Sequence, residues 1–339
     1  MIDIQPVLNG DRLAISRLLS QVENDTPIGQ QGLAELFPHT GRAYLIGVTG
    51  ATGTGKSSLV NQIAFHYRNP ENGGQPKKVA IVAVDPSSPF SGGALLGDRI
   101  RMTALSGDDG VFIRSMASRG SLGGLANATA GVVQVFDAAN YEIILIETVG
   151  AGQAEVDIAR LAHTTIVVEA PGLGDDIQAI KAGILEIADI LVVNKADRSG
   201  VEGTERALKN MLQLAQPMRR EFYPDVLKEV PRKSEHTGNE NLWEIPVQRT
   251  IATDGNGVAD LITVIAKHQT YLKQTGDLQI RERTRLANEL NIRLQATLMS
   301  EWRENLPTGL YDEVLGQLVN RELSPHMAVE ILLSKKVKK

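Results

Sequence analysis

The sequence contains no cysteine, few aromatic residues and no long apolar run. Without cysteine, disulfides, thiolate nucleophiles and thiolate metal sites are excluded, and we expect a reducing, cytoplasmic location. The longest apolar runs, such as residues 79–84 and 143–146, are far shorter than the ~20 residues of a membrane-spanning helix. Residues 1–6 include polar and acidic side chains, where a secretion signal needs a basic end and an apolar stretch. We therefore expect no membrane partner.

An excess of positive charge is also missing. The 35 lysines and arginines are outnumbered by 40 aspartates and glutamates, which gives a formal net charge of -5. This balance does not favour nucleic acid as a partner. The 42% of hydrophobic residues and 22% of charged residues are typical of a globular protein with a sizeable core.

Short runs rich in β-branched residues alternate with longer stretches of helical pattern. The runs are residues 44–48, 79–84, 111–113, 141–146, 164–168, 190–193 and 247–251. They are nearly continuous in apolar character, as strands are when helices bury both faces of a parallel sheet. This alternation predicts an α/β fold with a doubly wound, mostly parallel sheet.

The chain divides into three predicted parts. Residues 1–40 form an N-terminal helical segment, 41–268 form the α/β domain, and 269–339 form a C-terminal helical segment. The last segment contains a long charged helical stretch from Leu278 to Leu298, followed by a second helix around Leu310.

A glycine-rich segment follows the first predicted strand and opens a helix. Strand, loop and helix in this order are the context that a phosphate-binding P-loop requires. The glycines allow backbone N–H groups to surround phosphate oxygens, and the helix N-terminus adds positive potential. We expect Lys56 to reach the β- and γ-phosphates and Ser57 to bind Mg²⁺. The predicted nucleotide-binding residues of this segment are Gly50, Ala51, Thr52, Gly53, Thr54, Gly55, Lys56, Ser57 and Ser58.

The tetrapeptide Asn194-Lys195-Ala196-Asp197 directly follows another strand and indicates which base is bound. A carboxylate at Asp197 can accept two hydrogen bonds from guanine, which adenine cannot offer, so GTP and GDP are the expected ligands. Lys195 is expected to lie along the base, and Asn194 to brace the neighbouring loop. After the last strand, the Ala252 N–H is expected to meet the guanine O6 atom.

Three carboxylates end or follow strands where an open α/β sheet gathers its ligands. Asp85, Asp98 and Glu147 are therefore candidate Mg²⁺ ligands beside Ser57, directly or through water. The alternative for Asp98, which is also a catalytic candidate, is an ordinary position on a surface helix.

Two residues after Glu147 are candidates for sensing or attacking the γ-phosphate. Gly150 can offer its backbone N–H to that phosphate, a contact that is lost on hydrolysis. Gln153 either positions the attacking water or is simply a polar residue at a helix start.

At these residues the sequence resembles the MeaB/ArgK group of SIMIBI-class GTPases, which are chaperones of methylmalonyl-CoA mutase and related B12 enzymes. Residues 83–102 are similar to the first switch of that family, 147–155 to its second switch, and 171–181 to a third switch peculiar to the group. Residues 119–124 resemble a further loop of the family, and residues 323–328 resemble its closing helix. Ile251 departs from the Ser of the family's usual pattern.

The resemblance implies a site and a function. Asp85, Asp98 and Glu147 would be the Mg²⁺-site carboxylates with Ser57, and Lys181 and Asp175 would couple the third switch to nucleotide and mutase. The C-terminal helices would form a homodimer. GTP hydrolysis would gate adenosylcobalamin delivery to a B12-dependent acyl-CoA mutase and protect that enzyme.

Other functions stay open. GTPases that insert nickel or zinc usually carry Cys-rich or His-rich stores, whereas this chain has six scattered histidines, each more typical of a core or surface position. A transport-linked NTPase or kinase is the other alternative, against which Asp197 argues. The sequence does not identify the mutase, whether methylmalonyl-CoA, isobutyryl-CoA or 2-hydroxyisobutyryl-CoA mutase or another.

Overall fold

The computed structural model describes residues 3–71, 73–86, 105, 107–118, 124–148, 154–172, 187–215 and 243–334. The chain forms two compact units, Met1–Arg285 and Leu286–Lys339. The predicted boundary at residue 268 falls inside a helix, α10 (Val258–Thr275).

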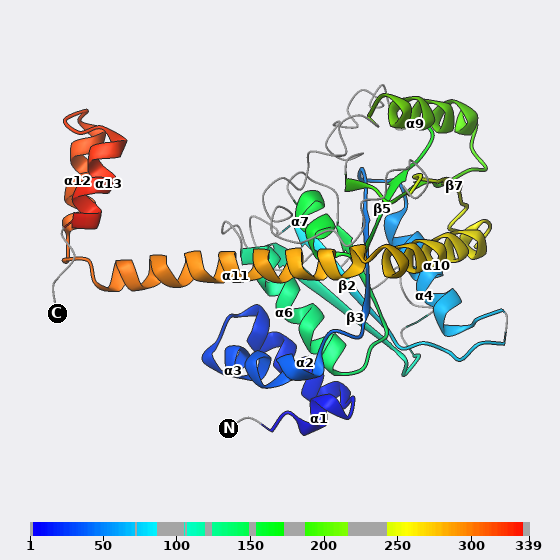
Figure 1. The fold of residues 1–339 in the computed structure, drawn as a ribbon, viewed down its shortest axis with the longest axis horizontal. Helices are drawn as coiled ribbons and strands as arrows, with labels where there is room; N and C mark the ends of the chain where they lie inside the picture. The colour runs from blue at the N-terminus through cyan, green and yellow to red at the C-terminus, as the bar shows by residue number, and fades with distance from the viewer. Residues whose placement is uncertain are drawn as a thin grey trace. The chain divides into compact units, whose positions relative to one another are not determined.

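Seven strands form one sheet in the described part of the first unit (Figure 1). The order is β3-β2-β4-β1-β5-β6-β7, and every pair of neighbours is parallel. Each strand overlaps one of the predicted apolar runs, although β3 extends to Ser118 where the predicted run ends at residue 113, and the predicted doubly wound fold is confirmed. The strands are β1 (Tyr44–Thr49), β2 (Val79–Pro86), β3 (Val111–Ser118), β4 (Ile143–Thr148), β5 (Thr164–Glu169), β6 (Ile190–Val193) and β7 (Val247–Arg249).

Helices cover both faces of the sheet. The N-terminal helices α1 (Gln5–Leu8), α2 (Arg12–Glu23) and α3 (Pro27–Leu36), with the short η1 (Phe37–His39), pack on one face together with α6 (Gly124–Ala138) and α7 (Ala154–Leu161). The opposite face carries α4 (Lys56–Arg68) and α10. A smaller core lies under α9 (Val201–Ala215).

Neighbouring residues of one strand supply the two cores. In β4, Ile144 and Ile146 pack with the N-terminal helices and α6, while Ile143 and Leu145 pack with α4 and α10. All four are buried, which explains why the strand is continuously apolar rather than alternating. Burial on both faces fixes the sheet, and with it the loops at the carboxyl ends of the strands.

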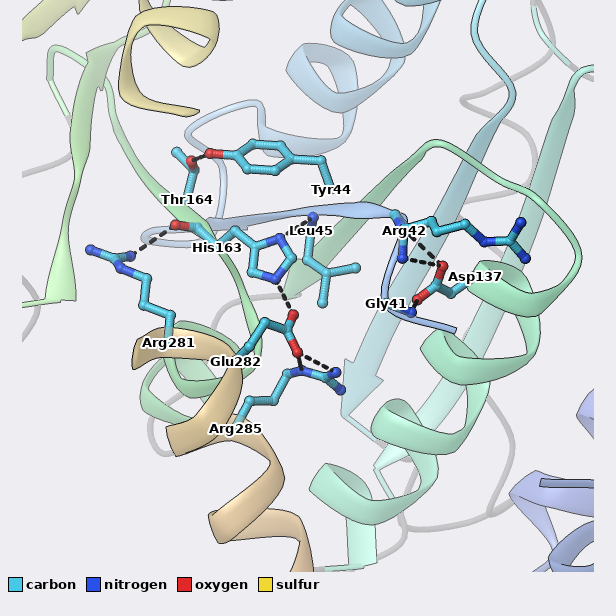
Figure 2. Close-up of polar contacts among 11 residues, drawn as sticks. Gly41, Arg42, Tyr44, Leu45, Asp137, His163, Thr164, Arg281, Glu282 and Arg285 are labelled. Atoms are coloured by element: carbon cyan, nitrogen blue, oxygen red, sulfur yellow. Dashed lines mark hydrogen bonds and ion pairs between the residues drawn. The ribbon is translucent and has the colours of Figure 1, made fainter. Parts of the chain in front are cut away.

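The amino end of β1 is fixed by a carboxylate of α6. Asp137 is buried and accepts hydrogen bonds from the backbone N–H groups of Gly41 (2.6 Å), Arg42 (3.1 Å) and Ala43 (2.9 Å) (Figure 2). These bonds satisfy three N–H groups just before the strand begins.

A second polar cluster joins the amino ends of β1, β5 and β6 to the first turns of α11 (Asp277–Glu304). We call it the α11 clamp; its members are His163, Asp189, Arg281 and Glu282. Arg281 donates to both carboxylate oxygens of Asp189 at 2.8 Å and to the His163 carbonyl at 2.9 Å. The His163 ring contacts Glu282 through Nε2 (Figure 2).

The tautomer of His163 follows from its partners. Its Nδ1 accepts the backbone N–H of Leu45 in β1 at 3.1 Å, so Nδ1 carries no proton. The ring proton therefore lies on Nε2, from which it is donated to Glu282. His163 thus connects α11 to β1 as a neutral ring.

The second unit is helical and contains the end of α11, α12 (Leu310–Val319) and α13 (Pro325–Ser334). Its small core comprises Leu310, Val314 and Ala328. Trp302 donates its ring N–H to the Leu332 carbonyl at 3.2 Å. Across both units, the described helices include none with the length and apolar character to cross a membrane.

The clamp makes a testable contribution to stability. Burial raises the pKa of Glu282, but the His163 hydrogen bond and the Arg285 charge lower it more, to about 2 from an ordinary 4.5. Because the pKa is lower in the folded state, the stabilising contribution is present above pH 4.5 and disappears as the pH falls toward 2. It amounts to roughly 3 kcal/mol at most.

Glu282→Gln keeps an acceptor for His163 but cannot ionise. We expect the variant to have a lower free energy of unfolding than wild type at pH 7, with the difference narrowing below pH 4.5, as measured by urea denaturation. Glu289→Gln, which alters an ion pair with Arg293 on the same helix, is the control. A difference that stays constant with pH would contradict the assignment.

Candidate nucleotide-binding site

The candidate site lies at the carboxyl edge of the sheet, opposite the clamp. Gly50 follows β1, Glu147 is near the end of β4, and Asn194 follows β6. These strands belong to the consecutive parallel set β4-β1-β5-β6, so their carboxyl ends bring the three segments to one edge.

The loop before α4 depends on glycines at two close approaches. Gly50 has a φ of 136°, and a Cβ atom there would lie 2.1 Å from the Val168 carbonyl oxygen of β5. Gly55 has a φ of 92°, and its Cβ would lie 2.5 Å from the Asn194 side-chain nitrogen. Only glycine fits either position, because both the backbone angle and the space exclude a side chain.

Lys56 places a buried cation at this loop. It is 5% exposed, and its Nζ donates to the carbonyls of Gly50 at 2.8 Å and Ala51 at 2.9 Å. The ammonium group therefore lies against the segment that is predicted to surround phosphate, where a positive charge is required.

Ser57 and Glu147 supply an oxygen-rich pair beside the loop. The Ser57 hydroxyl donates to Glu147 Oε1 at 2.6 Å, and Glu147 is 1% exposed. A hydroxyl and a carboxylate are the hard oxygen ligands that Mg²⁺ prefers, so this pair fits the predicted metal. Within the described residues, no three acidic or histidine side chains gather around one point.

Asn194 connects three loops through its side chain. Its Nδ2 donates to the Thr54 carbonyl at 2.8 Å, and its Oδ1 accepts from the Ala252 N–H at 3.0 Å and the Thr250 hydroxyl at 3.1 Å. It is 2% exposed, so these bonds form away from water. The predicted bracing by Asn194 is thus present in the structure.

The neighbouring residues bring the base-recognition segment onto the P-loop. Lys195 has a φ of 57° and donates from Nζ to the Gly53 carbonyl at 2.6 Å. Asp197 is exposed two residues later. The Ala252 N–H donates to the Asn194 side chain in this structure. The predicted contact between this N–H and guanine O6 stays a prediction, and it would require the N–H to be shared between the two acceptors.

Several predicted site residues fall outside the described residues: Asp98, Gly150, Gln153, Asp175 and Lys181. The backbone of Asp85 lies at the end of β2, next to β4, which carries Glu147, whereas its side chain is not among the described ones. The structure therefore brings together Lys56, Ser57, Glu147 and Asn194, and the remaining assignments stay predictions.

One pair of site residues has no signal in the sequence. Thr148 donates its hydroxyl to that of Thr49 at 3.0 Å, and both are almost fully buried at the ends of β4 and β1. Threonine is common in strands, so neither residue stands out locally. Only the pairing of the strands identifies the contact.

Removing the Asn194 side chain should separate the three loops. Asn194→Ala deletes three buried hydrogen bonds, each worth about 1 kcal/mol, so we expect a lower melting temperature and a guanine nucleotide affinity reduced by at least ~10-fold. Titration of a fluorescent GDP analogue measures the affinity. Asn305→Ala, which removes an exposed bond to the Glu301 carbonyl, should leave the affinity unchanged. Wild-type affinity in Asn194→Ala would contradict this role.

Comparisons with known proteins find relatives over most of the chain. The chain is 40% identical over 332 residues to a Pyrococcus horikoshii protein named as a GTPase, covering 98% of this chain and 96% of that protein. It is 33% identical to the GTPase ArgK of Escherichia coli, over 81% of this chain and 78% of the relative. It is also 30% identical to the mitochondrial methylmalonic aciduria type A homolog of Mus musculus, over 86% and 65% respectively.

A solved structure and a family model complete the comparison. The crystal structure of a protein named LAO/AO transport system kinase has the same fold, with a TM-score of 0.64 at 23% identity, covering 98% of this chain and 95% of that one. The family model described as methylmalonyl Co-A mutase-associated GTPase MeaB matches residues 15–306. The chain therefore belongs to the MeaB family of GTPases.

Proposed function

We propose that this protein hydrolyses GTP in the presence of Mg²⁺ and uses the cycle to gate adenosylcobalamin delivery to, and protect, a B12-dependent acyl-CoA mutase. The observation that carries the nucleotide part is the Asn194 side chain, which joins the P-loop at Thr54 to the Ala252 loop. Phosphate-binding and base-binding segments are thereby fixed to each other. The absence of cysteine from the sequence is compatible with the cytoplasm, where we place the activity.

Each site residue has a part in this proposal. Lys56 would neutralise the β- and γ-phosphates, and Asp197 would accept two hydrogen bonds from guanine. Ser57 and Glu147 would exchange their mutual hydrogen bond for Mg²⁺ coordination, with Asp85 and Asp98 contributing directly or through water. Bound Mg²⁺ would spread the charge that develops on the transferred phosphoryl group. Gly150 and Gln153 remain candidates for sensing the γ-phosphate and positioning water.

The mutase partner is supported by the family to which the chain belongs, whose name includes methylmalonyl-CoA mutase. There are two alternatives. One is a GTPase that assists another metalloenzyme, which differs from the proposal in its partner and is distinguished by a partner experiment. The other is a transport-linked NTPase or kinase, as the name of the structurally similar protein suggests, and the guanine selectivity expected from Asp197 argues against it.

Hydrolysis by the protein alone should be slow, at roughly 10⁻⁴–10⁻² per second, because unassisted GTPases lack an arginine finger. A cognate B12-dependent mutase should accelerate it at least ~10-fold, as measured by phosphate release. Lys181→Ala should keep GTP binding but lose the acceleration, whereas Lys209→Ala, on the exposed face of α9, should respond like wild type. A rate indifferent to every B12-dependent mutase of the cell would remove the chaperone function and leave the GTPase.

We also propose that the protein is a homodimer that associates through its C-terminal unit. Four leucines recur every fourth residue along α11 and are 37% to 65% exposed: Leu286, Leu290, Leu294 and Leu298. On a helix this spacing places them along one side. Apolar side chains that share one side of a helix and are exposed to water support a surface that a second copy would cover.

Light scattering should give twice 36.7 kDa for the full chain at micromolar concentration. Leu290→Glu combined with Leu294→Glu should yield a monomer that still binds GDP, because two carboxylates would be buried unpaired in the interface. Leu13→Glu, at a leucine of α2 that is 59% exposed, should remain dimeric. A monomeric wild type would refute the dimer.

A further inference from the structure

The α11 clamp contacts three strands that each lead to the nucleotide site. His163 hydrogen-bonds Leu45 in β1, and β1 ends just before Gly50. Asp189, directly before β6, accepts the Thr165 N–H of β5 at 2.9 Å. The clamp residues are thus at one end of the strands, and the loops that are predicted to hold nucleotide are at the other.

The far ends of β5 and β6 are themselves connected to the site. Asn194, which follows β6, donates its backbone N–H to the Glu169 carbonyl of β5 at 2.8 Å. The Val168 carbonyl of β5 occupies the space beside Gly50. A small shift of β5 or β6 along its length would therefore change the packing of the P-loop and of Asn194, because a close-packed interior has low compressibility and transmits strain.

The buried charge of Asp189 opposes any displacement of Arg281. Asp189 is 4% exposed, and the Arg281 guanidinium pairs with both of its carboxylate oxygens. Moving Arg281 away would leave this carboxylate with the Thr165 N–H at 2.9 Å and the His268 ring at 3.5 Å, and losing the guanidinium partner of a buried carboxylate is strongly destabilising. Glu282 is the next residue on the helix, so its contact with His163 is lost in the same movement. Displacement of the start of α11 would therefore break its contacts with Asp189 and His163 together.

We propose that the clamp is a positioning device that couples α11 to retention of guanine nucleotide: seated, it keeps the loops closed on the nucleotide, and released, it lets GDP leave faster. The clamp lies in the first turns of α11, whose later residues belong to the 286–339 unit. The proposal rests on the guanine nucleotide site proposed above, but not on the mutase as partner.

The test measures GDP release from the full chain with a fluorescent GDP analogue and excess unlabelled GDP. Glu282→Gln removes the charge that faces His163. Arg281→Lys replaces the bidentate contact of the guanidinium with Asp189 by a single ammonium group. We expect both variants to release GDP about 5- to 10-fold faster than wild type, a coupling in the usual range. Glu289→Gln, farther along α11, should release GDP at the wild-type rate.

A second control distinguishes coupling of the clamp to the nucleotide site from a general loss of stability. Asp137→Asn weakens the hold of α6 on the amino end of β1 and touches no clamp residue (Figure 2). Even if its melting temperature falls as far as those of the two clamp variants, Asp137→Asn should release GDP at close to the wild-type rate. Equal acceleration in Asp137→Asn, or wild-type release in both clamp variants, would overturn the coupling. Wild-type protein that fails to bind GDP would instead overturn the nucleotide site itself.

Discussion

The side chain of Asn194 is the contact on which the arrangement of the candidate site depends. A P-loop and a base-recognition loop come from strands far apart in the sequence, and each is a turn that could take several positions. By donating to Thr54 and accepting from Ala252, one buried amide fixes the separation between the place for phosphate and the place for the base. Gly55 permits this approach, because any side chain there would collide with the amide.

The charged side chains at the two ends of the sheet have different kinds of partner. At the carboxyl edge, Lys56 is buried against loop carbonyls, and Glu147 is buried against Ser57. These two side chains are therefore fixed in place before the proposed ligands of opposite charge, phosphate and Mg²⁺, bind. At the amino edge, Asp189 and Arg281 satisfy each other and leave the charge balanced. Burial raises the pKa of Asp189, but the adjacent Arg281 lowers it more, so the carboxyl stays ionised.

Much of this architecture could be predicted from local sequence. The strands are short, continuously apolar runs followed by turn residues, and that pattern is caused by burial on both faces. The P-loop and the Asn194 segment were predictable because their residues are consecutive and the chemistry of phosphate and guanine dictates their types. The sequence also predicts bracing by Asn194, but it does not identify the three partners of this side chain, Thr54, Thr250 and Ala252. The clamp could not be predicted in this way, because His163, Asp189 and Arg281 are separated by long stretches of chain and none belongs to a local pattern. Their meeting depends on strand order and on where α11 begins, just as the hydroxyl pair of Thr49 and Thr148 exists only because β1 and β4 are neighbours.

The central claim is that these loops form a guanine-selective nucleotide site, and calorimetric titration with GTP and ATP in the presence of Mg²⁺ tests it most directly. Two hydrogen bonds from guanine to the Asp197 carboxylate predict that GTP binds at least ~100-fold more tightly than ATP, a difference of about 3 kcal/mol. Asp197→Asn should erode that preference and favour xanthosine triphosphate, whose 2-oxo group accepts from the amide. Equal affinities of the wild-type protein for GTP and ATP would contradict the account.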